Sequence, residues 1–134
     1  MSSISRVAIM GMGIVAPGAT GAESFSAMLR EGKGGILPVE RFDTEGLRAH
    51  TAGLLREFRA RDFISPMKMR RMNNLSRYAV SATRLALDDQ AAASGGPPAD
   101  HTGVAIGTTF GPVETSVEYM REYVEKGAAL APPQ

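Results

Sequence analysis

Basic side chains gather in one stretch of the sequence, and their chemistry is that of an anion-binding surface. Between residues 60 and 87 the only acidic residue is Asp62, whereas the basic residues are Arg61, Lys68, Arg70, Arg71, Arg77 and Arg84. Lys68, Arg70 and Arg71 fall near the start of an expected helix, where positive charge is slightly unfavourable against the helix dipole. The patch would suit an acidic protein partner or a phosphate group. A solvated helix face is an equally open interpretation.

A glycine-rich turn follows the first apolar run. Residues 11–16, GMGIVA, match G-x-G-x-x-A, the pattern that holds a pyrophosphate at a helix N-terminus in dinucleotide-binding proteins. Pro17-Gly18 follows at once and would disrupt the first turn of that helix. No second apolar strand ending in an acidic residue comes about 20 residues later, as that fold requires. We therefore interpret the glycines as a tight strand exit that permits close packing, and we expect no cofactor.

Nucleophiles and metal ligands of the usual kinds are scarce. The chain contains no cysteine, which excludes disulfides, thiolate metal sites and a cysteine nucleophile within it. His50 and His101 lie in polar loop contexts, so we assign neither a role and expect no metal site. Four glutamates at helical spacing are interpreted as a solvated face: Glu114, Glu118, Glu122 and Glu125. We assign no catalytic residue within the chain.

The elements that must position these residues alternate between strands and helices. Residues 6–15 and 103–109 are nearly continuous apolar runs with β-branched residues, typical of strands buried on both faces. Apolar spacing predicts a short helix over residues 22–31. A long helix is expected from Pro66, capped by Ser65, to about residues 90–93. A further helix is expected from about residue 113, with Gly127 as its stop.

Irregular segments separate these elements. Residues 36–64 show no clear period and are expected to be loop with short elements, and residues 94–100 are expected to turn. Residues 128–134 cannot continue a helix. The order strand, helix, loop, long helix, strand, helix indicates an α/β layered fold. Two strands buried on both faces need more neighbours than this chain supplies, so we expect part of a larger sheet, with apolar faces exposed unless the remainder covers them.

Composition narrows the classes of partner. The net charge is +1 and 22% of the residues are charged, which gives no reason to expect nucleic acid or a membrane surface as the main partner. The longest apolar runs are far shorter than the ~20 residues of a membrane span. Residues 1–6 show no apolar targeting segment. A cytoplasmic location is therefore expected.

Three segments, in order, resemble the β-ketoacyl-acyl-carrier-protein synthases. Residues 6–36, RVAIMGMGIVAPGATGAESFSAMLREGKGGI, resemble the opening of the family, residues 65–89 its long helix with an R-R-M core, and residues 103–127 the strand and helix before the nucleophile region. The resemblance covers essentially the whole chain and identifies residues 1–134 as the N-terminal segment of such a synthase domain. It implies an α/β thiolase-like layered fold, of which this chain is the N-terminal part of the first α-β-α half and is incomplete on its own.

The resemblance also implies a reaction and a set of partners. Family members, usually dimers, join an acyl chain to a malonyl unit on acyl carrier protein. A cysteine thiolate takes the acyl chain, and two histidines assist decarboxylation and stabilise the enolate. None of these residues falls in the matching region, so we expect them outside this chain, which alone would be inactive. The implied partners are acyl carrier protein with its phosphopantetheine-bound acyl chain, the remainder of the synthase, and a second synthase or chain-length-factor subunit.

Residue roles implied by the resemblance are limited to binding. Arg70 and Arg71 align with the basic helix start that docks the acidic carrier protein in relatives, and Lys68 is adjacent. Phe110, in T-T-F-G, falls where relatives line the acyl pocket, so its ring implies a limit on chain length. The alternative function is a non-catalytic, chain-length-factor-like partner, which keeps the fold and the pocket but lacks the nucleophile. A free-standing α/β binding module is disfavoured, because its strands would lack neighbours.

Overall fold

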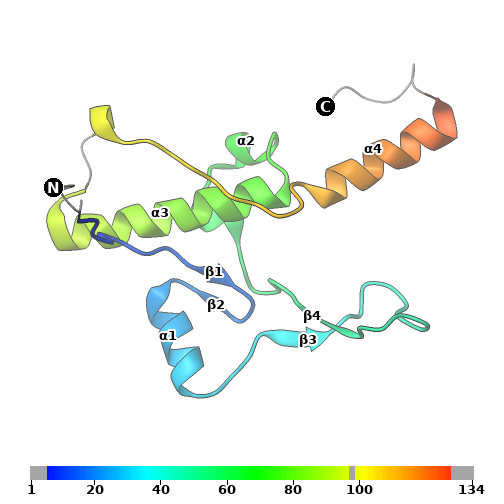
Figure 1. The fold of residues 1–134 in the computed structure, drawn as a ribbon, viewed down its shortest axis with the longest axis horizontal. Helices are drawn as coiled ribbons and strands as arrows, with labels where there is room; N and C mark the ends of the chain where they lie inside the picture. The colour runs from blue at the N-terminus through cyan, green and yellow to red at the C-terminus, as the bar shows by residue number, and fades with distance from the viewer. Residues whose placement is uncertain (1–5, 97–98, 128–134) are drawn as a thin grey trace, which may run out of the picture.

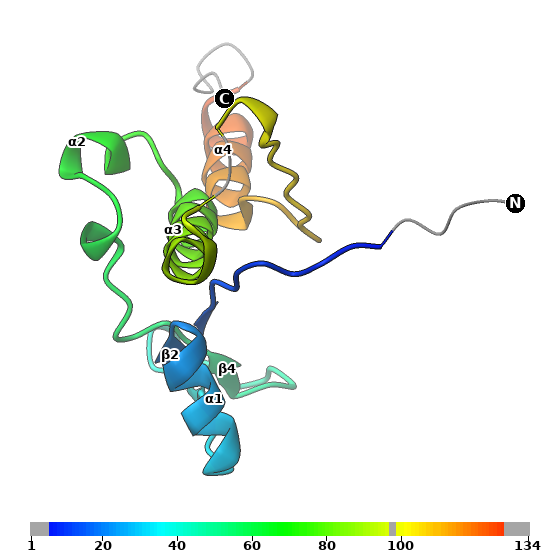
Figure 2. The ribbon, with the colours of Figure 1, turned by 90° about the vertical axis from the view of Figure 1, so that its left-hand side faces the viewer.

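A computed structural model describes residues 6–96 and 99–127 of the chain (Figure 1). The helices and strands, in chain order, are β1 (Val15–Ala16), β2 (Ala19–Thr20), α1 (Ala22–Arg30), β3 (Ile36–Pro38), β4 (Thr51–Gly53), η1 (Ala60–Asp62), α2 (Pro66–Met69), α3 (Asn74–Ser94), η2 (Ala99–His101) and α4 (Val113–Lys126). Seen along α3, the hairpins and α1 lie on one side of this helix and α4 lies on the other (Figure 2). The molecule is therefore organised around α3.

The sheet structure consists of two small antiparallel hairpins. In the first, Val15 of β1 lies opposite Thr20 of β2. Pro17 and Gly18 make the turn between them, and Gly18 has a φ of 84°, a left-handed conformation that favours glycine. In the second hairpin Ile36 of β3 lies opposite Gly53 of β4. The G-x-G-x-x-A motif thus leads into a hairpin and not into a helix, which removes the structural context that a dinucleotide site needs.

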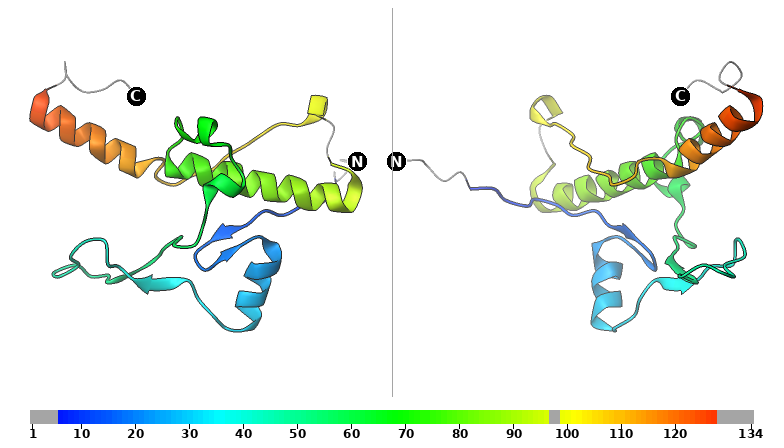
Figure 3. Two further views of the ribbon diagram at one scale, coloured as in Figure 1. Left: turned by 180° about the vertical axis from the view of Figure 1, so that it is seen from behind. Right: turned by 45° about the vertical axis from the view of Figure 1, so that its right-hand side comes forward.

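Neither of the two expected buried strands forms as predicted. Within residues 6–15 only Val15 belongs to a strand, and the segment before it crosses the side of α3 without a paired neighbour (Figures 1 and 3). Residues 103–109 form no strand either. A strand needs a neighbour to satisfy its backbone N–H and C=O groups, and the described part of the chain supplies none here. Val7 is 94% exposed and Val104 75%, which confirms that apolar surface lies uncovered.

The long helix expected from Pro66 is interrupted. Pro66 does begin a helix after Ser65, but α2 ends at Met69 and α3 begins only at Asn74. Asn73 has the extended conformation of an N-cap, and its Oδ1 accepts a hydrogen bond from the Ser76 N–H at 2.8 Å. An extended residue cannot continue α2, so the cap separates the two helices. At the other end, Gly95 stops α3 with a left-handed φ of 83°.

The other two helices form where they were predicted. α1 ends at Arg30, one residue before the expected end, and α4 ends before Gly127. The turn expected over residues 94–100 is only partly described, because residues 97 and 98 lie outside the described residues. The segment 128–134, expected not to be helical, also lies outside them. Among the described helices none is long and apolar enough to cross a bilayer.

A small aromatic cluster fixes η1 and the segment before it to α3. The Phe58 ring stacks on Phe63 with centroids 6.1 Å apart and meets Tyr78 of α3 edge-on at 5.4 Å. Ile64, next to this cluster, is 4% exposed and is one of the few buried apolar side chains in the described ranges. These contacts place the α2 segment, which begins two residues after Ile64, beside the first half of α3.

The first segment of the chain packs on α3 through its glycines. A Cβ atom at Gly13 would overlap the main-chain carbonyl of Ala82, and one at Gly11 would overlap that of Ala86. Between them, the Met12 N–H donates to Asp89 Oδ2 at 2.8 Å. The interpretation of these glycines as close-packing positions is therefore confirmed. Asp89 therefore tethers the segment to α3.

Candidate functional site

Three residues of the expected basic cluster share one short surface. Lys68 lies in α2, and Arg70 and Arg71 lie in the linker between α2 and the α3 cap. All three side chains are exposed. Within residues 6–96 and 99–127 no carboxylate forms an ion pair with any of them. We call Lys68, Arg70 and Arg71 the basic linker; its charges are free to meet an anionic partner.

Of the other arginines of the expected cluster, Arg61 is exposed in η1, whereas Arg77 and Arg84 bind groups within the chain. Arg84 forms an ion pair with Asp88, one turn further along α3, at 3.1 Å on the exposed surface. Arg77 is half-buried, and its guanidinium donates to the Met69 carbonyl oxygen at 3.2 Å and to Asn74 Oδ1 at 3.3 Å. These two arginines therefore bind groups within the chain. The basic region of the sequence is not one continuous surface.

Phe110 lies just before α4 and is 83% exposed. With side chains of the first two turns of α4 it lines an open hollow of about 300 Å³, whose other lining residues are Val113, Ser116, Val117 and Met120. The hollow has no charged group, so it would accommodate apolar matter and not an ion. This placement is compatible with contact to an acyl chain or to an apolar protein surface.

The starts of α3 and α4 are joined by a hydrogen bond. Asn74 Nδ2 donates to Glu114 Oε2 at 2.7 Å. This contact joins the start of α3, which follows the basic linker, to the start of α4, which follows Phe110. Glu114 was expected on a solvated face; it is instead a partner of α3, because it occupies the first turn of α4 next to the α3 N-terminus.

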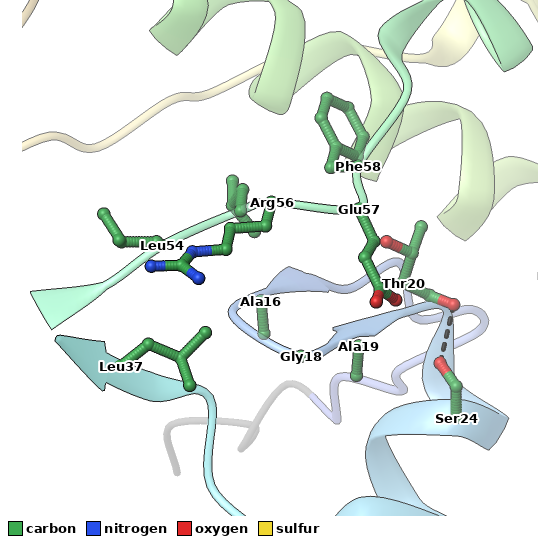
Figure 4. Close-up of a pocket in the computed structure, with 11 residues that line it drawn as sticks. Ala16, Gly18, Ala19, Thr20, Ser24, Leu37, Leu54, Arg56, Glu57 and Phe58 are labelled. Atoms are coloured by element: carbon green, nitrogen blue, oxygen red, sulfur yellow. Dashed lines mark hydrogen bonds between the residues drawn. The ribbon is translucent and has the colours of Figure 1, made fainter. Parts of the chain in front are cut away.

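A second hollow, of about 620 Å³, lies between the β1–β2 hairpin and the chain that follows β4 (Figure 4). The hydroxyl of Ser24, which lines the hollow, donates to the Thr20 carbonyl oxygen at 2.6 Å. Arg56, another lining residue, contacts the Glu40 carboxylate at 3.2 Å. No histidine or cysteine lines the hollow. The Ser24 hydroxyl thus donates to the main chain, and no histidine stands beside it to activate it as a nucleophile.

The two histidines stand apart from any catalytic arrangement. His50 Nδ1 lies 3.0 Å from Thr44 Oγ1 in an exposed loop. His101 Nε2 lies 3.6 Å from Asp100 Oδ2, also exposed. In the described ranges no group of three or more potential ligands is placed to hold a metal ion. The candidate binding groups are therefore the basic linker and Phe110.

Two residues of this junction were not identified from the sequence as parts of a site. Arg77 was counted as one more charge of the basic cluster, and Glu114 as one more solvated acid. The signal for Arg77 is its spacing, because residues three apart on a helix are neighbours and Asn74 precedes it by three. The contact between Asn74 and Glu114 joins residues 40 apart in the sequence. No local pattern could have indicated it.

Comparison with known proteins gives a consistent result. The family model "Beta-ketoacyl synthase, N-terminal domain" matches residues 5–132. The 3-oxoacyl-[acyl-carrier-protein] synthase 2 of Staphylococcus aureus (strain N315) is 33% identical over 133 residues, which cover 99% of this chain and 32% of the relative. The synthase of the same name from Vibrio harveyi is 32% identical over 128 residues, covering 96% and 31%. This chain thus spans about a third of the length of these relatives.

A solved structure supports the fold. The ishigamide ketosynthase/chain length factor superposes with a TM-score of 0.70 and 30% sequence identity, over 93% of this chain and 31% of the other. A ketosynthase fold of which only a part is present explains why extended apolar segments lie here without strand partners. The α/β thiolase-like fold class and its incompleteness are therefore confirmed. The chain belongs to the β-ketoacyl synthase family and corresponds to the N-terminal domain of that family.

Proposed function

We propose that this chain is the N-terminal part of a β-ketoacyl-[acyl-carrier-protein] synthase, which condenses an acyl chain with malonyl-acyl carrier protein in fatty-acid or polyketide biosynthesis. The observation that carries the proposal is the family match over residues 5–132. The chain contains no cysteine. The catalytic cysteine and histidines are therefore proposed to lie outside these 134 residues, and the chain alone is proposed to be inactive.

The proposed reaction needs a thiolate, because the acyl group must first be captured and later released. The cysteine sulfur attacks the acyl thioester, and the carrier's thiol leaves. Malonyl-carrier protein then loses CO₂, and the resulting enolate carbon attacks the acyl carbon, which frees the cysteine thiolate. A thiolate is both a strong nucleophile and a good leaving group. Within this scheme the present chain supplies binding surfaces and no reacting atom, and it needs no cofactor.

The basic linker is proposed to dock the acyl carrier protein. Its support is the exposure of Lys68, Arg70 and Arg71 and the lack of an ion pair to any of them within the described residues. Unpaired charges at a surface attract an oppositely charged partner and fix its orientation. An acidic carrier protein meets that requirement and would deliver its phosphopantetheine-bound acyl chain nearby.

Phe110 is proposed to line the acyl pocket and to limit the length of the chain. The ring lies on an apolar hollow at the start of α4. The Asn74–Glu114 hydrogen bond holds this start of α4 against the start of α3, next to the basic linker. Carrier docking and chain binding would thus be organised from one junction. The remainder of the synthase and a second synthase or chain-length-factor subunit are the further partners proposed.

The test of the synthase function is acyl transfer to the complete protein that contains this chain. Intact-mass spectrometry after incubation with an acyl-carrier protein should show one acyl adduct on the polypeptide, and malonyl-carrier protein should then release CO₂. Blocking cysteines with iodoacetamide beforehand should abolish the acyl adduct, because the thiolate that takes the acyl group is then alkylated. A complete protein that takes no acyl group and releases no CO₂ contradicts the synthase function.

A chain-length-factor-like role is the second candidate. The specific observation in its favour is that the similar solved structure is named as a ketosynthase/chain length factor. In that case the acyl adduct should appear only on a partner polypeptide, and the complete protein should lack a cysteine at the nucleophile turn. We also propose a cytoplasmic location, which cell fractionation with an antibody against the chain would test.

A further inference from the structure

Arg77 bridges the two helices that flank the basic linker. It lies in the first turn of α3, and its guanidinium reaches back to the last residue of α2, where it donates to the Met69 carbonyl oxygen at 3.2 Å. A second donor of the same group contacts Asn74 Oδ1 at 3.3 Å. A guanidinium presents its donors as a rigid planar fork, so two such contacts fix both position and angle. Arg77 thereby connects the end of α2 to the start of α3, the two helices between which Arg70 and Arg71 lie.

Within the described residues no other side chain hydrogen-bonds to the backbone of residues 66–72. α2 has only four residues and no side-chain cap, and so short a helix is not stable by itself. The Arg71 N–H reaches the Lys68 carbonyl oxygen only at 3.4 Å, whereas the Met72 N–H reaches that of Met69 at 3.1 Å. The Met69 carbonyl, which already accepts from Met72, is also the group that Arg77 binds. The course of the backbone at Arg70 and Arg71 therefore depends on the Arg77 contact.

Arg77 itself is not placed to meet a partner. Its side chain is half-buried and its Nε atom is buried, in contrast to the exposed Lys68, Arg70 and Arg71. Two of its donor nitrogens are already used by Met69 and Asn74. Its positive charge lies behind the linker and adds little to the outer surface. Geometry thus separates one arginine that holds the linker from the three cations that the linker displays.

We propose that Arg77 is a positioning residue for carrier docking, which sets the spacing and direction of Lys68, Arg70 and Arg71. The inference rests on the proposed docking function of these three residues. Binding is weaker when the contacting side chains must first be ordered, because this ordering costs conformational entropy. A linker that is already held by Arg77 avoids that loss. Removing the bridge should weaken docking even when the charge at position 77 is retained.

The test compares two variants in the complete synthase. Arg77→Lys keeps the charge and loses the planar fork, and Arg77→Gln loses both. The probe is a fluorescently labelled holo-acyl carrier protein, titrated by anisotropy at several NaCl concentrations. Both variants should raise the Kd by a similar factor of about three to ten, the size expected for losing one typical hydrogen bond. If Arg77→Lys binds as tightly as the unchanged protein, only the charge matters and the inference is wrong.

A small substrate separates positioning from general damage. An N-acetylcysteamine acyl thioester has no carrier protein to dock, so its kcat/KM should be unchanged in both variants, whereas kcat/KM for the carrier-bound acyl chain should fall. An equal fall for both substrates would mean that Arg77 only maintains the fold, and would overturn the inference. Arg84→Lys is the matched negative control, because this arginine lies on the same helix, is exposed and pairs with Asp88.

A charge-reversal variant distinguishes failure of the inference from failure of the docking proposal. Arg70→Glu combined with Arg71→Glu should weaken carrier binding strongly, and the loss should shrink as salt is raised. If this double variant binds normally, the basic linker does not dock the carrier, and the role of Arg77 falls with it. If the double variant is weakened but Arg77→Lys and Arg77→Gln are not, docking stands and only the positioning role is overturned.

Discussion

Phe110 is a large apolar side chain that lies exposed beside other exposed apolar side chains. Its ring is 83% exposed, and Val113 and Met120 beside it are 52% and 54% exposed. Burying a side chain of this size is worth about 1.5–3 kcal/mol, so a complete protein would not leave it in water without a reason. A bound acyl chain or the surface of another subunit would supply that cover. The size of the Phe110 ring then determines how much space the hollow leaves for that acyl chain or protein surface.

We predict that Phe110→Ala in the complete synthase lengthens its products. Removing the ring opens the hollow at the start of α4, and each additional buried CH₂ group is worth about 0.8 kcal/mol, so chains longer by about one or more two-carbon units should accumulate. Mass spectrometry of the carrier-bound products gives the length profile. Phe42→Ala removes another exposed ring, in the loop between β3 and β4, and should leave the profile unchanged. An unaltered profile for Phe110→Ala would exclude the ring as a determinant of length.

At the scale of elements, prediction from the sequence succeeded where the determinants are local. α1 and α4 carry their apolar spacing and their glycine stops within a few residues, so their positions could be predicted. The break between α2 and α3 was missed because Met72 fits the apolar spacing of one continuous helix. Asn73 decides the matter by capping α3 with its own side chain. The Asn73-Asn74 pair was the available signal, since asparagine favours caps over helix interiors.

The strands could be predicted only as apolar runs, because pairing is not a local property. Residues 6–13 hold a fixed place through contact with α3 and not through a sheet. The site shows the same division. The basic linker and Phe110 could be located from the sequence, whereas the bridging role of Arg77 and the Asn74–Glu114 contact depend on how helices meet.

We predict that Gly13→Ala destabilises the complete protein. A Cβ at this position would overlap the Ala82 carbonyl, and backbone of α3 cannot yield as a flexible side chain would. Overpacking of this kind typically costs about 1–3 kcal/mol in the free energy of unfolding. Denaturant unfolding followed by circular dichroism gives the change in midpoint. Gly34→Ala is the control, because no atom lies within 4 Å of the added Cβ. Equal midpoints for the two variants would contradict the close contact with α3.

On the scale of the whole molecule, the surface is too large for an independent domain. The chain exposes 11137 Å², against roughly 6,800 Å² for a compact monomer of this mass. Large apolar side chains contribute to the excess on the first segment, on residues 103–109 and on α4. Surfaces of this kind are covered in a stable protein. We expect the part of the family fold that these 134 residues lack, about two thirds of it, to cover these apolar side chains.

We therefore predict that the 134 residues expressed alone do not behave as a folded monomer. Exposed apolar surface should bind the dye ANS strongly and drive self-association, and thermal unfolding should lack a cooperative transition. Size-exclusion chromatography with light scattering and calorimetry would measure these properties. The complete protein, measured alongside, should bind little dye and unfold cooperatively. A monomeric 134-residue chain with a sharp transition would show that its core suffices.

The hydrogen bond between Met12 and Asp89 has a consequence for the order of events during synthesis. It joins residues 77 apart in the chain, and closing such a loop costs about 4 kcal/mol in conformational entropy before any contact compensates. The first segment can dock only after α3 has left the ribosome, since Gly11, Met12 and Gly13 all contact that helix. Until then this apolar segment remains uncovered. The nascent chain should therefore be a client for ribosome-associated chaperones until translation has passed α3.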